Sequence, residues 1–169
     1  MSILYVESPV GRLALEADGD TLTALSWTSG RWTGGRWTGG RWTRAAKRTT
    51  DGKATPVLEE ARRQLDRYFA HKLRRFELPL EPRGTPFQKS VWKMMSAIPF
   101  GETATYGGMA MALGSGPRAV GMACGRNPVP IIVPCHRVLG SGGKEGGFSG
   151  GEGLPTKRKL LALEGVVLL

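Results

Sequence analysis

The sequence predicts an α+β protein built from two domains, and three observations support this. Residues 3–26 alternate apolar and polar side chains between turn signals, as antiparallel strands do. Residues 56–71, and the chain from Thr85 onward, place apolar side chains at helical spacing. Between these regions, Glu81-Pro82-Arg83-Gly84 has the composition of a domain boundary. We therefore expect a small α/β domain over residues 1–82 and a mainly helical domain over residues 83–169.

The N-terminal domain is expected to be a small sheet covered by one helix. Turn signals at Ser8–Gly11 and Asp18–Asp20 divide residues 3–26 into two or three strands. One face of the sheet would be supplied by Leu4, Val6, Leu13, Leu15, Leu22 and Leu25. The helix over 56–71 begins near Pro56, a residue that suits the first helical turn. Phe76–Pro82 then fits either an edge strand or a linker.

A five-residue repeat separates the strands from this helix. Its units run Trp27-Thr28-Ser29-Gly30-Arg31, Trp32 to Arg36 and Trp37 to Arg41. A period of five fits neither helix nor strand, so residues 28–54 are predicted to form a long mobile loop. Between Arg31 and Lys53 there are seven basic residues and one acidic residue. Alternating tryptophan and arginine suit contacts to nucleic acid bases and phosphates, whereas an insertion without essential function would show the same pattern.

The C-terminal domain is expected to begin with three helices. Thr85 and Gln88 have the spacing of a capping box, with Pro86 between them at the first helical position. Two short helices, over 105–114 and 117–125, are joined by Gly114-Ser115-Gly116 and have the outline of a helix-turn-helix. The last of these helices carries the small residues Ala119, Gly121 and Ala123, which allow close approach of a partner or close packing within the domain. Arg118, in its first turn, would face a partner or solvent.

An apolar run ending in reactive side chains follows these helices. Its sequence is Ile131-Ile132-Val133-Pro134-Cys135-His136-Arg137-Val138. The β-branched residues predict a short buried strand that stops at Pro134. Neighbouring side chains on a strand point to opposite faces, so Cys135 and His136 would act together only if the backbone bends or a water connects them. The alternative for Cys135 is an inert buried thiol.

A carboxylate on the last helix completes a candidate catalytic set. The segment 154–165 is predicted to be helical, and Glu164 shares the inward face of Leu160 and Leu161. A carboxylate near the negative end of a helix dipole requires a cationic or hydrogen-bonding partner, and histidine is suitable. A thiol, a base and an acid that orients the base form an activated nucleophile. Exposure of Glu164 to solvent, or pairing with Lys157, is the alternative.

The overall composition limits the class of protein. There is no apolar run near 18 residues and no signal-peptide pattern, so we expect a soluble cytoplasmic protein with no membrane association. With two cysteines and two histidines, neither a disulfide framework nor a dedicated zinc site is expected. The net charge of +10 favours a polyanionic partner, and nucleic acid is the first candidate.

Four motifs in the C-terminal half resemble those of O6-alkylguanine-DNA alkyltransferases. They are Arg118-Ala119-Val120-Gly121, then Asn127 to Val138, then Gly147-Phe148-Ser149-Gly150-Gly151, and finally Lys157 followed by Leu160 to Gly165. The resemblance covers residues 83–166, about half the chain. Residues 1–80 are compatible with the ribonuclease-H-like N-terminal domain of that family, and the C-terminal domain would be winged-helix-like. The tryptophan and arginine repeat is not a feature of the family.

The resemblance implies a repair protein that acts once, without any cofactor or metal. An alkyl group would move irreversibly from O6 of guanine, or O4 of thymine, in double-stranded DNA to Cys135. His136 would deprotonate the thiol through a water, Glu164 would hold the imidazole, and Asn127 would act as a hinge.

The resemblance also assigns roles in binding the DNA. Tyr106 would rotate the target nucleotide out of the duplex, and Arg118 would fill the gap. Ala119 and Gly121 lie on the helix that would enter the minor groove. Ser149 would donate to O6, between pocket walls formed by Val138 and Phe148. Phe148 stands where the family often has tyrosine, so one hydroxyl is absent here.

The expected partner is therefore double-stranded DNA containing O6-alkylguanine, bound by a monomer, with cooperative assembly on DNA left open. The competing hypotheses are a lesion-binding protein of the same fold without transfer activity, a helix-turn-helix DNA-binding regulator and a cysteine hydrolase that turns over repeatedly.

Overall fold

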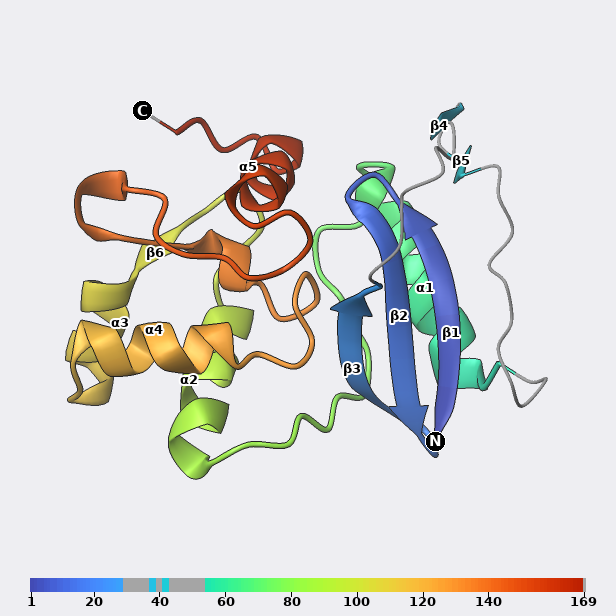
Figure 1. The fold of residues 1–169 in the computed structure, drawn as a ribbon, viewed down its shortest axis with the longest axis horizontal. Coiled ribbons are helices and arrows are strands. Elements are labelled where there is room, and N and C mark those ends of the chain that lie inside the picture. Colours follow the sequence, from blue (N-terminus) through green and yellow to red (C-terminus); the bar gives the residue numbers. More distant parts are fainter. Residues whose placement is uncertain (29–36, 39–40, 43–53, 169) are drawn as a thin grey trace. The chain divides into compact units, whose positions relative to one another are not determined.

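The computed structural model describes residues 1–28, 37–38, 41–42 and 54–168. The chain divides into two compact units, Met1–Pro82 and Arg83–Leu169, each with its own buried side chains. Figure 1 shows the elements of both units in sequence colours.

The N-terminal unit contains a three-stranded antiparallel sheet. Its strands are β1 (Ser2–Ser8), β2 (Gly11–Asp18) and β3 (Thr21–Trp27), in the order β1-β2-β3. This confirms the strands predicted over residues 3–26. The six apolar residues expected on one face are all buried: Leu4, Val6, Leu13, Leu15, Leu22 and Leu25. Alternation of apolar and polar residues therefore located the core face of the sheet.

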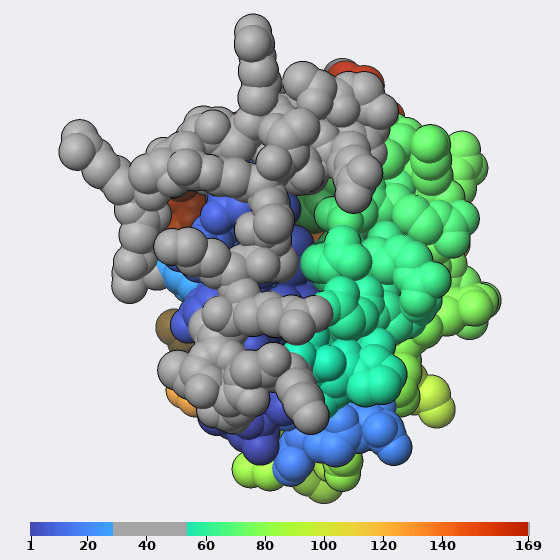
Figure 2. Space-filling view, turned by 90° about the vertical axis from the view of Figure 1, so that its right-hand side faces the viewer, coloured from blue at the N-terminus to red at the C-terminus, as the bar shows by residue number. Residues whose placement is uncertain are grey.

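Helix α1 (Pro56–Phe69) packs across this sheet and contacts all three strands (Figure 1). Its inward residues Leu58, Leu65 and Tyr68 have no exposed surface. Its opposite face lies on the surface of the unit (Figure 2), where Arg62 pairs with carboxylates one turn away on either side. The helix ends two residues earlier than 71, and His71 has a left-handed backbone with φ 60°.

The chain after α1 is a linker with one bridge to the sheet. Leu80 forms a single parallel bridge with Leu22, and no strand is assigned over Phe76–Pro82. The buried Gln64 side chain holds this linker: it donates to the carbonyl oxygen of Glu77 at 3.0 Å and accepts from its backbone N–H at 2.9 Å.

The repeat region is described only in part. Trp37–Thr38 (β4) and Arg41–Trp42 (β5) pair antiparallel. The remainder of the predicted 28–54 loop, apart from Thr28 and Ala54, lies outside the described residues.

The C-terminal unit contains four α-helices among its described residues, together with one short parallel strand pair. The helices are α2 (Pro86–Ser96), α3 (Tyr106–Leu113), α4 (Pro117–Gly125) and α5 (Leu154–Leu163). Strands β6 (Ala104–Thr105) and β7 (Val138–Leu139) pair parallel. The predicted capping box of α2 is present, since Thr85 and Gln88 each bond the other's backbone. The α+β fold class is confirmed.

Helix α4 packs against α2 through its buried side, which includes a small residue. Ala123 is buried, and its carbonyl oxygen accepts a hydrogen bond from the indole of Trp92 in α2 at 2.9 Å. Val120 and Cys124 share this buried side, whereas Arg118 is exposed and Met122 keeps 64% of its surface. Ala123 therefore packs within the domain, which is one of the two roles predicted for the small residues of this helix.

The strand predicted before Cys135 is wrong, although its residues are buried as expected. Residues Ile131 to Val133 form a turn, with Ile131 in the left-handed region at φ 72° and one isolated bridge between Pro130 and Val133. Proline cannot donate to a strand ladder, and prolines stand at 128, 130 and 134. The turn is closed instead by a hydrogen bond from Val133 N to Val129 O at 2.9 Å.

None of the helices among the described residues is both long enough and apolar enough to cross a membrane.

Candidate active site

Cys135 begins a short 3₁₀ helix, η1 (Cys135–Arg137), directly after Pro134. A 3₁₀ helix has about three residues per turn, so consecutive side chains point in different directions without lying on opposite faces. The backbone bend that Cys135 and His136 require is therefore present. Cys135 retains 9% of its surface, and His136 has none exposed.

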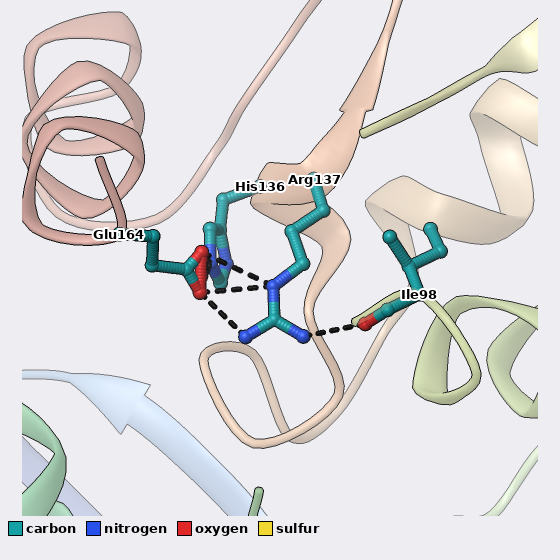
Figure 3. A network of polar contacts seen from close by, with 4 residues as sticks. All are labelled: Ile98, His136, Arg137 and Glu164. Carbon is teal, nitrogen blue, oxygen red and sulfur yellow. Dashed lines mark hydrogen bonds and ion pairs between the residues drawn. The ribbon is translucent and has the colours of Figure 1, made fainter. Parts of the chain in front are cut away.

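His136 and Glu164 form a buried pair across 28 residues of sequence. The imidazole Nε2 lies 3.0 Å from both Oε1 and Oε2 of Glu164 (Figure 3). Because a carboxylate only accepts, Nε2 carries the hydrogen and Nδ1 carries the lone pair. Among the described residues, Nδ1 has no hydrogen-bond partner. The base nitrogen of His136 is thus unprotonated and unoccupied by protein groups.

Arg137 is the second partner of Glu164, and the sequence analysis did not identify it. Its Nε donates to Oε1 and Oε2 at 2.9 and 3.1 Å, and Nη2 donates to Oε1 at 2.5 Å. Its Nη1 donates to the carbonyl oxygen of Ile98 at 2.6 Å, which connects η1 to the end of α2 (Figure 3). The buried Glu164 is therefore paired with Arg137 and His136, and pairing with Lys157 or exposure to solvent is excluded.

The charges in this cluster have defined states. Burial opposes ionisation of Glu164, but hydrogen bonds from His136 and Arg137 outweigh burial and lower its pKa below the ordinary value. Burial lowers the pKa of His136 despite the neighbouring carboxylate. At neutral pH the pair is therefore a carboxylate and a neutral imidazole.

Burial also raises the pKa of the Cys135 thiol. Hydrogen bonds from the Asn127 side chain and from the backbone of Cys135 and His136 act in the opposite direction, as does the charge of Lys157. The resting protein therefore holds Cys135 as a thiol, with donors already placed to stabilise the thiolate once its proton leaves.

Asn127 shapes the turn that leads to Cys135. It follows the end of α4, where its Nδ2 donates to Val133 O at 2.8 Å and its Oδ1 accepts from Val129 N at 3.0 Å. These two bonds connect α4 to the turn that carries Ile131. The position of Cys135 therefore depends on the Asn127 side chain.

Tyr106, at the start of α3, borders the same site. Burial raises its pKa to about 12, with further contributions from Cys124 and Cys135, whereas the backbone of Gly147 acts to lower the pKa. Gly146 lies so close that a Cβ there would be 2.8 Å from Tyr106 Cε2. Gly121 of α4 faces the same ring, since its Cβ would lie 4.0 Å from Tyr106 Cδ1.

Lys157 is a buried ammonium that the sequence analysis did not assign to the site. Its Nζ donates to Val138 O at 2.7 Å and to Gly147 O at 3.2 Å, and lies 5.9 Å from the centre of the Tyr106 ring. Burial lowers its pKa, while the nearby Cys135 and Cys124 raise it. The sequence contained a signal for the burial of Lys157, because this residue is seven residues before Glu164 and shares a helix face with Leu160 and Leu161.

The remaining predicted residues differ in how deeply they are buried. Val138 is fully buried in β7, and Cys124 is buried with a pKa raised to about 12, first by burial and then by Cys135. Phe148 is half-buried, and Ser149 is exposed on the loop before α5. On α4, Arg118 is exposed and Ala119 is half-buried. The structure thus brings Cys135, His136, Glu164, Asn127 and Tyr106 into one cluster and leaves Arg118 and Ser149 at the surface.

The part of the chain that the structure describes contains no group of three or more histidine, cysteine, aspartate or glutamate side chains suited to a metal ion.

Family models match both halves of the chain. The model of the 6-O-methylguanine DNA methyltransferase ribonuclease-like domain matches residues 2–82, and that of the DNA binding domain of the same methyltransferase matches residues 86–166. The two matches together span most of the sequence.

Relatives and solved structures agree with these matches. The methylated-DNA–protein-cysteine methyltransferase of Methanosarcina acetivorans is 41% identical over 161 residues, covering 94% of this chain and 95% of the relative. The constitutive enzyme of that name from Bacillus subtilis is 40% identical and covers 85% and 84%. The crystal structure of Mycobacterium tuberculosis OGT in complex with DNA is similar with a TM-score of 0.76 and 41% identity, covering 95% and 90%. With both domains matched in order and about two-fifths of residues identical to these relatives, the chain belongs to the 6-O-methylguanine DNA methyltransferase family.

Proposed function

We propose that this protein transfers the alkyl group of O6-alkylguanine, and of O4-alkylthymine, from double-stranded DNA to its own Cys135 in a single turnover. The single observation that carries the proposal is the buried Cys135, His136 and Glu164 cluster, in which the imidazole Nδ1 has no protein partner among the described residues. The names of the relatives, and the DNA bound to one of them, support DNA as the substrate.

The first step is removal of the thiol proton. A water connects Cys135 Sγ to His136 Nδ1 and passes the proton to the imidazole, whose positive charge Glu164 then balances at 3.0 Å. Asn127 and the backbone N–H groups of η1 stabilise the sulfur anion.

The second step is transfer. The sulfur attacks the alkyl carbon, an S–C bond forms, and the C–O6 bond breaks with its electron pair left on O6. A hydroxyl donor at O6 stabilises that developing charge, and Ser149 takes this role. The departing guanine anion then takes up the proton held by the His136 imidazolium, through water, so that both become neutral, and the thioether bond on Cys135 remains.

The DNA must present its base outside the stack, because the alkylated atom is inaccessible within the duplex. In the proposed complex, α3 and α4 form a helix-turn-helix, and α4 enters the minor groove with Ala119 and Gly121 close to the backbone. Tyr106 turns the nucleotide outward, Arg118 fills its place, and Val138 and Phe148 border the pocket. The exposed position of Arg118 in the first turn of α4 supports this assignment. We expect a monomer to perform the reaction in the cytoplasm.

Mass spectrometry of the intact protein tests the proposal. After incubation with a duplex carrying one O6-methylguanine, the protein should gain one methyl group on Cys135 and no more, however long the reaction runs. Cys135→Ala should gain nothing and still bind the duplex, whereas Cys124→Ala, which removes the second buried thiol, should still be methylated. Repeated turnover, or binding without any mass gain, would disprove the proposal.

A further inference from the structure

Three consecutive residues at the start of α5 hold the loop between Gly140 and Gly153, which we call the 140–153 loop. Thr156 Oγ1 accepts from the backbone N–H of Glu152 at 2.9 Å. Lys157 Nζ donates to the carbonyl oxygen of Gly147 at 3.2 Å. Arg158 donates from Nε and Nη2 to the two carboxylate oxygens of Glu145, at 2.5 and 2.7 Å. One helical turn therefore fastens the middle of the loop, at Glu145 and Gly147, and its end, at Glu152.

The three attachments differ in how easily they break. Thr156 and Lys157 are buried, at 2% and 0% exposure, and their hydrogen bonds to the loop are partly buried. The Arg158 and Glu145 side chains are 56% and 27% exposed, so their bidentate ion pair is accessible to water and salt. The ion pair is thus the attachment that a change in charge or ionic strength alters first.

The ion pair is adjacent to the part of the loop that meets the active site. Glu145 directly precedes Gly146, whose backbone lies against the Tyr106 ring, and Gly147 comes next in the chain. Phe148 and Ser149 follow immediately. Glu145 is therefore three residues before the proposed pocket wall, Phe148, and four before the proposed O6 donor, Ser149, so a displacement of Glu145 moves the segment that carries both.

We propose that the Arg158–Glu145 ion pair is a specificity-determining contact that keeps the 140–153 loop against Tyr106 and so limits the size of the alkyl group that Cys135 accepts. Arg158 and Glu145 are positioning residues, since they act through Gly146, Gly147 and Phe148. The proposal rests on the proposed function, because it concerns which adducts are transferred and not whether transfer occurs. Opening the loop adds room beside Tyr106, which a benzyl group needs and a methyl group does not.

The test compares single-turnover rates on two duplexes, one with O6-methylguanine and one with O6-benzylguanine. Arg158→Glu should raise the benzyl-to-methyl rate ratio about two- to fivefold, the range expected from loss of one exposed ion pair. Lys159→Glu is the matched control, because it makes the same charge change at an exposed position on the same helix and should keep the wild-type ratio. The double variant Arg158→Glu with Glu145→Arg restores the pair and should restore the wild-type ratio, which a general loss of stability would not do.

Salt provides a second measurement without mutation. Raising the ionic strength should increase the ratio for the wild-type protein and leave the ratio of Arg158→Gln unchanged, because the neutral side chain has no charge interaction with Glu145 to screen. The effect of salt on DNA binding is common to the two duplexes and cancels in the ratio.

The outcomes separate the two proposals. If the wild-type protein takes up an alkyl group but Arg158→Glu, with an unchanged unfolding midpoint, keeps the wild-type ratio, this inference is overturned and the proposed function stands. A ratio that rises equally in Lys159→Glu, or that the charge swap fails to restore, also overturns it. If the wild-type protein takes up neither group, the proposed function fails and this inference fails with it.

Discussion

Four charged or basic side chains of the C-terminal unit are almost completely buried: His136, Arg137, Lys157 and Glu164. Burying a charge is costly unless hydrogen bonds and an opposite charge compensate. Glu164 meets this requirement with Arg137 and His136, whereas the polar contacts of Lys157 with described residues are hydrogen bonds to the carbonyl oxygens of Val138 and Gly147. A buried ion pair of this kind is weak evidence for added stability, since well-packed apolar residues of similar volume are often equally stable or more so.

The buried His136 should make the protein sensitive to acid. Its folded pKa is lower than the ordinary 6.5, so below pH 6.5 the unfolded chain takes up a proton that the folded protein does not. Stability must then fall as pH decreases, by at most about 1.4 kcal/mol per pH unit. Glu164, whose folded pKa lies below 4.5, adds a second loss that begins only under pH 4.5.

Denaturant unfolding across this range checks the expectation. His136→Gln keeps a donor for Glu164 but cannot titrate, so its stability should fall less between pH 6.5 and 4.5 than that of the wild type. Equal slopes for the two proteins would show that His136 is protonated in the folded state.

At the scale of elements, the helices were predicted well and the connections were not. Helices α1 to α4 lie within two residues of the expected ranges, because proline at their starts, the capping box of α2 and helical spacing are local signals. The turn before Cys135 was not predicted, because the three β-branched residues favour a strand. The prediction took account of Pro134 but not of Pro128 and Pro130. The Asn127 side chain, whose two hydrogen bonds hold that turn, is a longer-range feature.

Two glycines of the 140–153 loop separate the effect of a contact with Tyr106 from the effect of backbone strain. Gly146 and Gly142 have φ of +69° and +68°, so alanine at either position costs about 1–2 kcal/mol of stability. Only at Gly146 would the new methyl meet another group, at 2.8 Å from Tyr106, whereas Gly142 has nothing within 4 Å. We expect Gly146→Ala to slow methyl transfer about tenfold or more and Gly142→Ala to leave the rate unchanged.

Single-turnover rates on the O6-methylguanine duplex, together with unfolding midpoints, distinguish the two effects. If both variants transfer at the same rate, the contact between the loop and Tyr106 has no part in the reaction.

At the scale of the whole molecule, the positive charge is unevenly distributed. Residues 31–53 contribute +6, seven basic residues less one acidic residue, to the net charge of +10. On α1, by contrast, Arg62 and Arg63 are paired with carboxylates of the same helix. We therefore expect this segment to contribute strongly to any long-range attraction to DNA.

Replacing Arg31 and Arg36 by glutamine should weaken DNA binding and reduce its salt dependence. Each lost phosphate contact lowers the slope of log K against log salt by about 0.9, so the expected change is up to about 1.8. Replacing Arg62 and Arg63, an equal change in charge, should leave the slope near the wild-type value. Fluorescence anisotropy with an undamaged duplex at several salt concentrations measures the slopes, and an unchanged slope in the first variant would exclude a DNA-binding role for the segment.

The sequence by itself determined the class of fold, the core face of the sheet and the starts of the helices, and it predicted Cys135, His136 and Glu164 as a candidate catalytic set. Each of these depends on spacing along the chain or on side-chain chemistry, and both can be read locally. Tertiary structure alone decided that Arg137 meets Glu164 across 27 residues, that Lys157 is buried against Val138 and Gly147, and that Arg158 holds Glu145. The physical reason is that a charged side chain is stable in the interior only where folding brings its partners to it, and no local pattern specifies which distant partners those are.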